Sequence, residues 1–374
     1  MRFTIDKEQF LKGLSIAGRA VPSSANLPAL LCFKLSLSSK GLEIVASNND
    51  VSIWTVVPHS VNEREIIRNS LPGQALINAK VLTEVIRKSG GEEISFEIID
   101  DSIAKIEDGN SAYRLTCSDV EEYPEIDTES QGIPFTVPCS EVAALVEQTA
   151  FAASNKDARA ALTAVNLKAE NGKLIATATD SARLSRKSID VDPSVRFSTN
   201  IPAKNLSEIV RLFDDATDVE ITPSAEKIVF AFGQTIASSR LISEDYPVKG
   251  QIIPTNFNYF LRVNSAQLLN ALERVSILTA ASRASVVALT MDDEGVEVSA
   301  NGDQVGSGNE RLQMAEFNGD RLQISFNSVY VAQAVRALGS EEVTMQFIGE
   351  MKPFVVRNPH DDSVVELITP MRTR

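Results

Sequence analysis

Phe3-Thr-Ile-Asp-Lys-Glu-Gln-Phe-Leu11 opens a pattern that the chain repeats, and this pattern decides the fold. It returns as Phe135-Thr-Val-Pro-Cys-Ser-Glu-Val-Ala143 and as Leu261-Arg-Val-Asn-Ser-Ala-Gln-Leu-Leu269. Each copy begins with the alternating apolar residues of a strand and continues with the apolar spacing of a helix. Three such copies indicate an internal repeat, which has to be recognised before a fold is assigned.

Two further blocks recur in the same order within each copy. A hairpin-like block with turn residues and alternating apolar positions occupies 41–50, 171–180 and 295–303. A second strand-to-helix block begins at Ile77, Ile201 and Phe326. Each repeat therefore predicts two helices among several strands. Because two helices cannot cover both faces of such a sheet, we expect an α+β fold.

The repeats also divide the chain. A length of 374 residues suits two or three domains. Segments 126–134 and 249–256 are rich in Pro, Gly and polar residues and lie between the copies. We therefore predict domains at 1–126, 134–250 and 257–374.

Charge is distributed unevenly between helices and the rest of the chain. The predicted helices are 6–20, 79–89, 139–156, 203–213, 265–283 and 328–338. They hold 12 Lys or Arg against 7 Asp or Glu, although the whole chain carries a net charge of −14. The strands and loops therefore carry all of the negative excess.

Basic residues recur at matching helix positions. Pairs seven residues apart share one face of a helix, and the apolar residues between them form the opposite stripe. The set is Lys12, Arg19, Lys80, Arg87, Lys204, Arg211 and Arg336. On one helix such residues would merely solvate the exposed side. Their recurrence in an acidic chain favours a surface that contacts DNA phosphates without reading bases.

The chain shows no signal for catalysis or for a bound metal. His59 and His360 are the only histidines, and neither belongs to a Ser-His-Asp or Cys-His pattern. Cys32, Cys117 and Cys139 lie far apart and are expected to be reduced. The glycine-rich loops of nucleotide and dinucleotide sites do not occur. We expect no catalytic residue, no metal and no cofactor.

The sequence also gives no indication of a membrane. It has no apolar leader and no run approaching the roughly 20 apolar residues of a transmembrane helix. We expect a cytoplasmic protein.

The repeats and several local motifs together resemble the bacterial DNA sliding clamps, the beta subunits of DNA polymerase III, over the whole chain. The motifs are MRFTI at 1–5, LPAL at 27–30, ATDSARL at 178–184, EDYP at 244–247, Phe326-Asn327 with Tyr330, and PMR at 370–372. The resemblance implies three tandem clamp domains whose helices line a ring and whose sheets lie outside. It implies a non-catalytic processivity factor, a homodimer that encircles double-stranded DNA without sequence specificity.

The resemblance further implies a pocket that binds short peptides of the replicative polymerase, the clamp loader and repair proteins. The matching positions are Leu162, Thr179, Ser181, Arg183, Leu184, Pro247, Asn327, Tyr330, Met351, Pro353, Leu367, Ile368, Pro370 and Met371. Apolar walls and a flexible thioether suit varied Leu or Phe anchors. For a single residue such as Leu162, ordinary core packing is the simpler interpretation.

Four positions depart from the family's pattern. Ala182 stands where His or Tyr is frequent, Gln251 where Arg is common, and Thr369 where Met or Val is frequent. Ser24 replaces an Arg that resembles a DNA contact. These departures leave the details of the pocket and of the first-domain loop open.

The resemblance places the dimer contact between two different surfaces. Tyr113 and Leu115 lie on one side, and Ile277 and Leu278 on the other. Such a heterologous contact must close by geometry. The alternative function is a tandem-repeat scaffold that binds proteins but not DNA.

Overall fold

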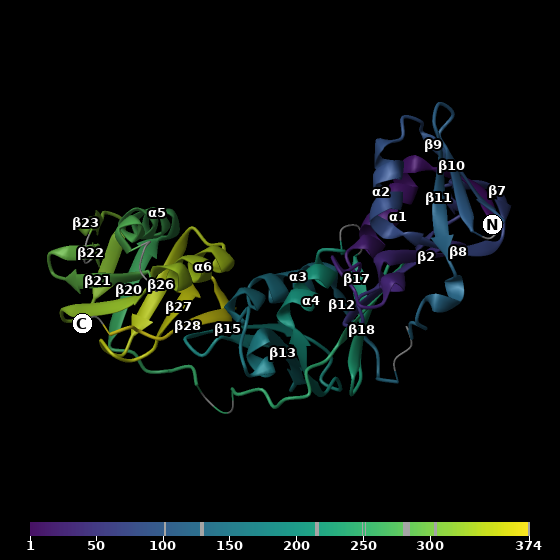
Figure 1. Ribbon diagram of the computed structural model, residues 1–374. Helices are drawn as coiled ribbons and strands as arrows, with labels where there is room; N and C mark the ends of the chain where they lie inside the picture. Colours follow the sequence, from purple (N-terminus) through teal and green to yellow (C-terminus); the bar gives the residue numbers. More distant parts are fainter. Residues whose placement is uncertain are drawn as a thin grey trace. The chain divides into compact units, whose positions relative to one another are not determined.

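The computed structural model describes residues 1–100, 102–127, 131–213, 217–248, 250, 252–279, 285–302 and 305–372 (Figure 1). They form two compact units. One comprises Met1–Ser140 with Glu208–Leu241, and the other comprises Glu141–Ser207 with Ile242–Arg374. These units follow the hydrogen-bonded sheets and divide the second repeat between them. The three domain boundaries deduced from the repeats remain a prediction.

The first unit is built on one antiparallel sheet with the strand order β12-β17-β18-β19-β4-β3-β2-β8-β11-β10-β9-β1-β7. Its elements are β1 (Arg2–Asp6), α1 (Lys7–Gly18), β2 (Cys32–Ser38), β3 (Gly41–Ser47), β4 (Val51–Val57), the hairpin β5 (Ser60–Val61) and β6 (Arg64–Glu65), β7 (Ile67–Leu71), β8 (Gly73–Asn78), α2 (Ala79–Lys88), β9 (Glu93–Ile99), β10 (Ile103–Glu107), β11 (Ala112–Ser118), β12 (Phe135–Pro138), β17 (Asp218–Pro223), β18 (Lys227–Phe232) and β19 (Thr235–Arg240). Pairing of β19 with β4 carries the sheet from the first repeat into strands of the second.

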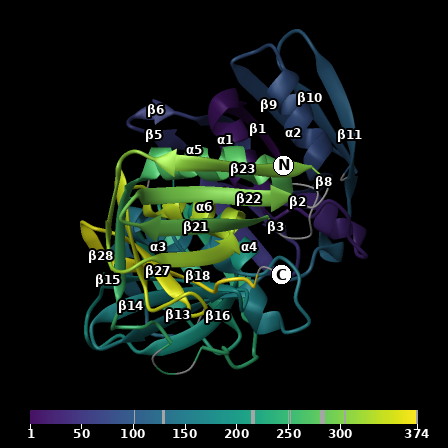
Figure 2. The same ribbon diagram turned by 90° about the vertical axis from the view of Figure 1, so that its left-hand side faces the viewer.

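The second unit contains two antiparallel sheets. One has the order β16-β13-β14-β15-β28-β27-β26-β20-β24, and the other has the order β23-β22-β21-β25. The elements are β13 (Ala164–Glu170), β14 (Lys173–Thr179), β15 (Arg183–Asp190), β16 (Phe197–Pro202), β20 (Tyr259–Asn264), α5 (Ser265–Ser276), β21 (Val286–Asp292), β22 (Gly295–Gly302), β23 (Gly306–Leu312), β24 (Ala315–Asn318), β25 (Leu322–Asn327), α6 (Ser328–Leu338), β26 (Glu342–Phe347), β27 (Phe354–Asn358) and β28 (Asp361–Ile368). Figure 2 shows β21, β22 and β23 side by side. Helices α3 (Cys139–Glu147) and α4 (Ala203–Val210) run across the borders of the two units.

Apolar helix faces pack on these sheets. In the first unit, Phe3 of β1 stacks on Phe96 of β9 with ring centroids 4.9 Å apart and meets Phe10 of α1 edge-on. In the second unit, Leu268 of α5 and Val331 of α6 join one buried cluster with strand residues. The opposite faces of these helices are exposed, so helices form one layer and sheets the other. This arrangement and the comparisons below confirm the α+β fold expected from the repeats.

Four of the helices begin with the same local device. The last residue of the preceding strand accepts a hydrogen bond from the backbone N–H of the first helical turn. These caps are Asp6 to Gln9 (3.0 Å), Asn78 to Val81 (3.0 Å), Asn264 to Gln267 (3.0 Å) and Asn327 to Val329 (3.0 Å). The second repeat has Pro138 and Pro202 at the matching positions, and these side chains cannot accept. The strand-to-helix motif in the sequence is therefore largely a capping signal.

Two predicted helices were much too long, and a third, 203–213, ends three residues early at Val210. Residues 139–156 were expected to form one helix, but α3 ends at Glu147 and a 3-10 turn follows at Ala150–Ala152. The Thr149 hydroxyl donates to the carbonyl of Leu145 at 2.7 Å, so this side chain engages a carbonyl at the helix end. Helix α5 ends at Ser276 and tightens into a 3-10 turn at Ile277–Thr279, whereas 265–283 had been expected. Residues 280–283 of that prediction lie outside the described residues.

The cap of α2 is a testable contribution to stability. Asn78→Ala removes the acceptor for the Val81 N–H and should cost about 1 kcal/mol of unfolding free energy. Asn78→Asp keeps an acceptor and adds negative charge at the helix N-terminus, so it should unfold close to the wild-type midpoint. Urea and thermal unfolding followed by circular dichroism compare the three proteins. Equal midpoints for wild type and Asn78→Ala would show that this cap contributes nothing.

Candidate functional site

All seven predicted DNA-contacting residues are exposed. Lys12 lies on α1 and Arg19 caps its end, Lys80 and Arg87 lie on α2, and Arg336 lies on α6. Lys204 is in the first turn of α4, and Arg211 follows that helix directly. Their exposure places the charges in solvent while the apolar stripes of the same helices are buried.

Carboxylates moderate this basic surface. Glu208 of α4 accepts from Arg19 at 2.9 Å and from Arg211 at 2.6 Å. Glu84 of α2 pairs with Arg87 and lies 3.5 Å from Lys88. Each carboxylate thus serves two cations, and each trio keeps one net positive charge. Exposed pairs of this kind contribute little to stability, so they mainly tune the field above the helices.

Shallow grooves run between helices on these basic faces. In the first unit, a groove of about 460 Å³ lies between α1 and α2, with Leu14 and Phe33 among its apolar lining and Arg19, Lys80 and Arg87 at its rim. In the second unit, a groove of about 380 Å³ is lined by residues of α3 and α6, including Arg336. Glu84 also lines the first groove and Glu147 the second, so the first groove has a cationic excess and the second is balanced.

The predicted peptide pocket has an apolar centre on β15 and β28. Leu184 and Leu367 are direct cross-strand partners and belong to one buried cluster with Val355 and Val365. Val248, Ile253 and Phe257 of the connecting segment pack against that cluster. The predicted linker 249–256 therefore contributes Ile253 to an apolar wall, together with the flanking residues Val248 and Phe257.

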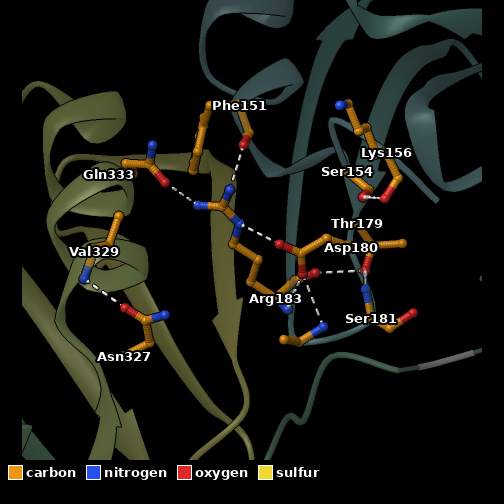
Figure 3. Close-up of polar contacts among 11 residues, drawn as sticks. Phe151, Ser154, Lys156, Thr179, Asp180, Ser181, Arg183, Asn327, Val329 and Gln333 are labelled. Carbon is orange, nitrogen blue, oxygen red and sulfur yellow. Dashed lines mark hydrogen bonds and ion pairs between the residues drawn. The ribbon is translucent and has the colours of Figure 1, made fainter. Parts of the chain in front are cut away.

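Arg183 holds the turn beside this cluster (Figure 3). Its Nε donates to Asp180 at 3.0 Å, one terminal nitrogen donates to the carbonyl of Phe151 at 2.7 Å, and the other contacts Gln333 of α6. The guanidinium also lies over the rings of Tyr330 at 4.5 Å and Phe151 at 5.3 Å. Its side chain is only 10% exposed, so Arg183 acts here as a structural clamp between β15 and α6.

The turn at 179–183 is fixed by its own side chains. Asp180 accepts from the backbone N–H groups of Ala182 at 3.0 Å and Arg183 at 3.1 Å, and Ser181 adopts a positive φ of 77°. The Thr179 hydroxyl donates to the carbonyl of Arg183 at 2.5 Å. Burial, reinforced by the Asp180 carboxylate, raises the pKa of the Tyr330 phenol, which therefore stays a neutral donor. These residues present a rigid polar rim next to the apolar centre.

The remaining predicted pocket residues are placed differently from one another. Pro247 and Met351 are exposed, while Pro353 and Met371 are half-buried. Leu162 and Pro370 are buried, and Ile368 belongs to the core cluster of α5 and α6, on the other face of β28 from Leu367. Asn327 caps α6, which occupies its side-chain oxygen.

The positions that depart from the family's pattern are also distributed. Ala182 accepts through its carbonyl from the N–H of Thr369 at 2.9 Å, so both lie at the pocket rim. Ser24 is exposed. Gln251 lies outside the described residues.

Among the described residues, the predicted dimer residues lie on or beside two strands that are unpaired along one edge: Tyr113 and Leu115 on β11, and Ile277 and Leu278 in a 3-10 turn beside β23. Tyr113 and Leu115 are half-buried on β11, which pairs with β10 along Ala112–Thr116 but with β8 only at Cys117 and Ser118. In the part of the chain that the structure describes, β23 pairs only with β22. Ile277 beside it is 69% exposed, whereas Leu278 packs against the core.

Several contributors to this site were not predicted from the sequence. Phe151 and Gln333 hold Arg183, and Val248, Ile253 and Phe257 complete the apolar cluster. For Val248, Ile253 and Phe257, the sequence signal is that they are apolar residues in an otherwise largely polar segment.

The described residues contain neither a cluster of metal-binding side chains nor a helix that could span a membrane. Among them, no three His, Cys, Asp or Glu side chains gather as a metal site. Likewise, no helix in the described ranges has the length and apolar character needed to cross a bilayer. His59 contacts the carbonyl of Ser38 at 2.9 Å, and His360 is exposed.

Family models match nearly the whole chain in three consecutive segments. Residues 1–127 match the N-terminal domain of the DNA polymerase III beta subunit, residues 136–248 its central domain, and residues 250–372 its C-terminal domain. These matches follow the order of the three repeats.

Individual relatives agree with the family models. The chain is 30% identical to proteins named beta sliding clamp from Bacillus subtilis and Staphylococcus epidermidis, with all of both chains covered. Among solved structures, the DNA polymerase sliding clamp from Bacillus subtilis and the DNA polymerase III beta chain from Streptococcus pneumoniae each superpose with a TM-score of 0.95 at 30% identity, again over both complete chains.

Proposed function

Because the chain belongs to the family of the DNA polymerase III beta subunit, the beta sliding clamps, we propose that two copies close into a ring in the cytoplasm with their basic helices facing duplex DNA. The chain is a non-catalytic DNA sliding clamp of the replicative polymerase. The observation that supports the proposed DNA surface most directly is the exposure of all seven recurrent cations on helices with buried opposite faces.

The chemistry of this surface suits sliding better than fixed binding. Long Lys and Arg side chains reach phosphates without reading base edges, so every position along the duplex is equivalent. Glu84 and Glu208 hold the net charge of their neighbourhoods low. Contacts are then weak and exchangeable, and residence on DNA comes from the closed ring.

Two unequal sheet edges provide the proposed subunit contact. The open edge of β11 along Ala112–Thr116 has backbone donors and acceptors available for another strand, and so does the outer edge of β23. Pairing of β11 in one chain with β23 in its partner continues a sheet across the boundary. Ile277 and Val305, 69% and 63% exposed, supply apolar surface beside the β23 edge. Because the two edges differ, the contact is heterologous. Two copies then form two such contacts, which together close the ring.

The apolar cluster around Leu184 and Leu367 is the proposed docking site for peptides of the polymerase, the clamp loader and repair proteins. Leu or Phe side chains of a partner gain by leaving water at such a surface. The rim at 179–183 and the amide NH₂ of Asn327 offer hydrogen bonds that orient the peptide backbone. The rigid Arg183 clamp keeps both parts of the site in register.

Charge reversal of the helix lysines tests the DNA surface. Lys80→Glu with Lys204→Glu should weaken association with nicked circular duplex about tenfold and lower the slope of log affinity against log salt by about two. Fluorescence anisotropy over a salt series measures both. These exposed sites should change stability little.

The matched control is Lys40→Glu with Lys352→Glu, which gives the same net charge at exposed positions off the helices. It should retain the wild-type salt slope. Equal losses for the two pairs would assign the effect to net charge and remove the helices from the DNA surface. Absence of any salt-dependent association in wild type would favour the protein-binding scaffold.

Ile277→Glu tests the subunit contact. It places a charge in the proposed apolar interface and should convert dimers to folded monomers at micromolar concentration. Leu278 is a poorer probe because it packs against the core of its own unit. Light scattering after size exclusion compares this variant with Ile133→Glu, at a side chain that is 86% exposed elsewhere. A fully dimeric Ile277→Glu protein contradicts the proposed contact.

Leu184→Ala tests the peptide site. It should weaken binding of a peptide with Gln and a Leu/Phe tail by on the order of 1–3 kcal/mol, because the anchor loses apolar contact. Leu322→Ala removes an equally buried leucine from the core cluster of α5 and α6 and controls for lost stability. Titration of a fluorescent peptide decides between them: similar affinities of the two variants would place the pocket elsewhere.

A further inference from the structure

Arg186 lies on the same face of β15 as Leu184, two residues further along the strand. Its cross-strand partners are Thr177 on β14 and Val365 on β28. The cross-strand partner of Leu184 on β28 is Leu367, which is two residues from Val365. The Arg186–Val365 pair is therefore the next pair on the same face of the sheet. Side chains on one strand face are about 7 Å apart at this spacing. Arg186 therefore occupies the layer directly beyond the apolar centre of the pocket.

The connecting segment reaches the same layer. Tyr246, next to the predicted pocket residue Pro247, is buried, and its phenol partly offsets the effect of burial by raising the pKa of Arg186. Thr177 stands two residues before the predicted pocket residue Thr179 on β14. Three separate segments that supply the pocket thus also surround the guanidinium.

Arg186 has little to neutralise it. Its Nε donates to the Thr177 hydroxyl at 3.3 Å, and within the described residues no carboxylate forms an ion pair with it. The side chain is half-buried, and burial lowers the pKa of its guanidinium, although an arginine remains charged at neutral pH. A partly desolvated cation without a counter-ion gains more from an incoming anion than a solvated one.

Neighbouring cations are different in this respect. Arg183 is paired with Asp180, and Lys187, on the opposite face of β15, lies 3.3 Å from Asp361 and 3.1 Å from the Ser363 hydroxyl. Arg186 is the one of these three cations that lies on the same face of β15 as Leu184. Among the described residues, its terminal guanidinium nitrogens have no hydrogen-bond acceptor. Those nitrogens form the planar fork that carboxylates fit.

We propose that Arg186 is a specificity-determining residue of the peptide site, where it binds a carboxylate that lies one or two residues from the apolar anchor of the partner peptide. This inference rests on the proposed peptide site. The carboxylate is either an acidic side chain or the C-terminus of the partner. Because the protein carries a net charge of −14, an acidic peptide is repelled at long range, and a local cation is needed to select it.

Matched peptides and variants test this role. The first peptide pair carries Gln and a Leu/Phe tail and ends either in a carboxylate or in an amide. The second pair is amidated and contains Asp or Asn next to the apolar anchor. Each is titrated against wild type, Arg186→Met, Arg186→Lys and Arg321→Met. Arg321 is an exposed arginine of the second unit near Asp292, so its variant carries the same charge change away from β15.

Wild type should prefer the carboxylate member of one pair by about tenfold at low salt, and this preference should shrink at high salt. The pair that shows the preference identifies the source of the carboxylate. Arg186→Met should bind both members equally, with the amide affinity of wild type. Arg186→Lys should retain part of the preference, and Arg321→Met all of it.

The outcomes separate the two proposals. Preserved discrimination in Arg186→Met overturns the role of Arg186, and so does equal binding of all peptides by wild type, while the pocket itself stands in both cases. Failure of every peptide to bind wild type, or equal binding by Leu184→Ala, removes the peptide site and the inference with it.

Discussion

Backbone pairing between β15 and β28 is the constraint on which the second unit depends. The register joins Arg183 to Ile368 and Lys187 to Val364, so a strand of the second repeat and the last strand of the third form one sheet. Because side chains alternate along a strand, a slip of one residue would exchange the two faces. If β28 slipped by one residue, Glu366 or Ile368 would stand opposite Leu184 in place of Leu367. The apolar centre of the peptide site exists only in the observed register.

The other face of the same pairing is polar but fully packed. Glu366 is 2% exposed, and burial raises the pKa of its carboxyl well above the ordinary value. Its carboxyl oxygen lies 2.8 Å from the Ser185 hydroxyl, which is also 2.5 Å from the carbonyl of Gln148. The Ser185 hydroxyl is the donor toward both oxygens, so one side chain links the carboxyl of β28 to the carbonyl of Gln148. This link ties β15 and β28 to the end of α3 and opposes a change of register.

The sequence predicted how elements begin better than how they end or pair. All six helix starts are within one residue of prediction. For four of them the signal is local, because Asp6, Asn78, Asn264 and Asn327 are capping residues at the end of a strand. The apolar spacing after Glu147 and Ser276 continued, but the backbone tightened into 3-10 turns. Pairing of β15 with β28 and of β19 with β4 joins distant residues, and no local pattern encodes it. The pocket residues could be predicted only from the resemblance to the family. That Arg186 has no ion-pair partner among the described residues is a property of the tertiary structure, and the sequence does not encode it locally.

Electrostatics divides the proposed tasks between two kinds of cation. On the helices, Arg19, Arg87 and Arg211 are exposed and already share carboxylates, so an approaching phosphate replaces existing partners and gains little. On β15, Arg186 has lost part of its hydration without gaining a counter-ion. A ligand anion there restores an interaction that folding removed, and the gain depends strongly on its position. Exposed cations that already pair with carboxylates therefore suit DNA, along which the protein must slide. A half-buried cation without a counter-ion suits a peptide carboxylate that must be bound selectively.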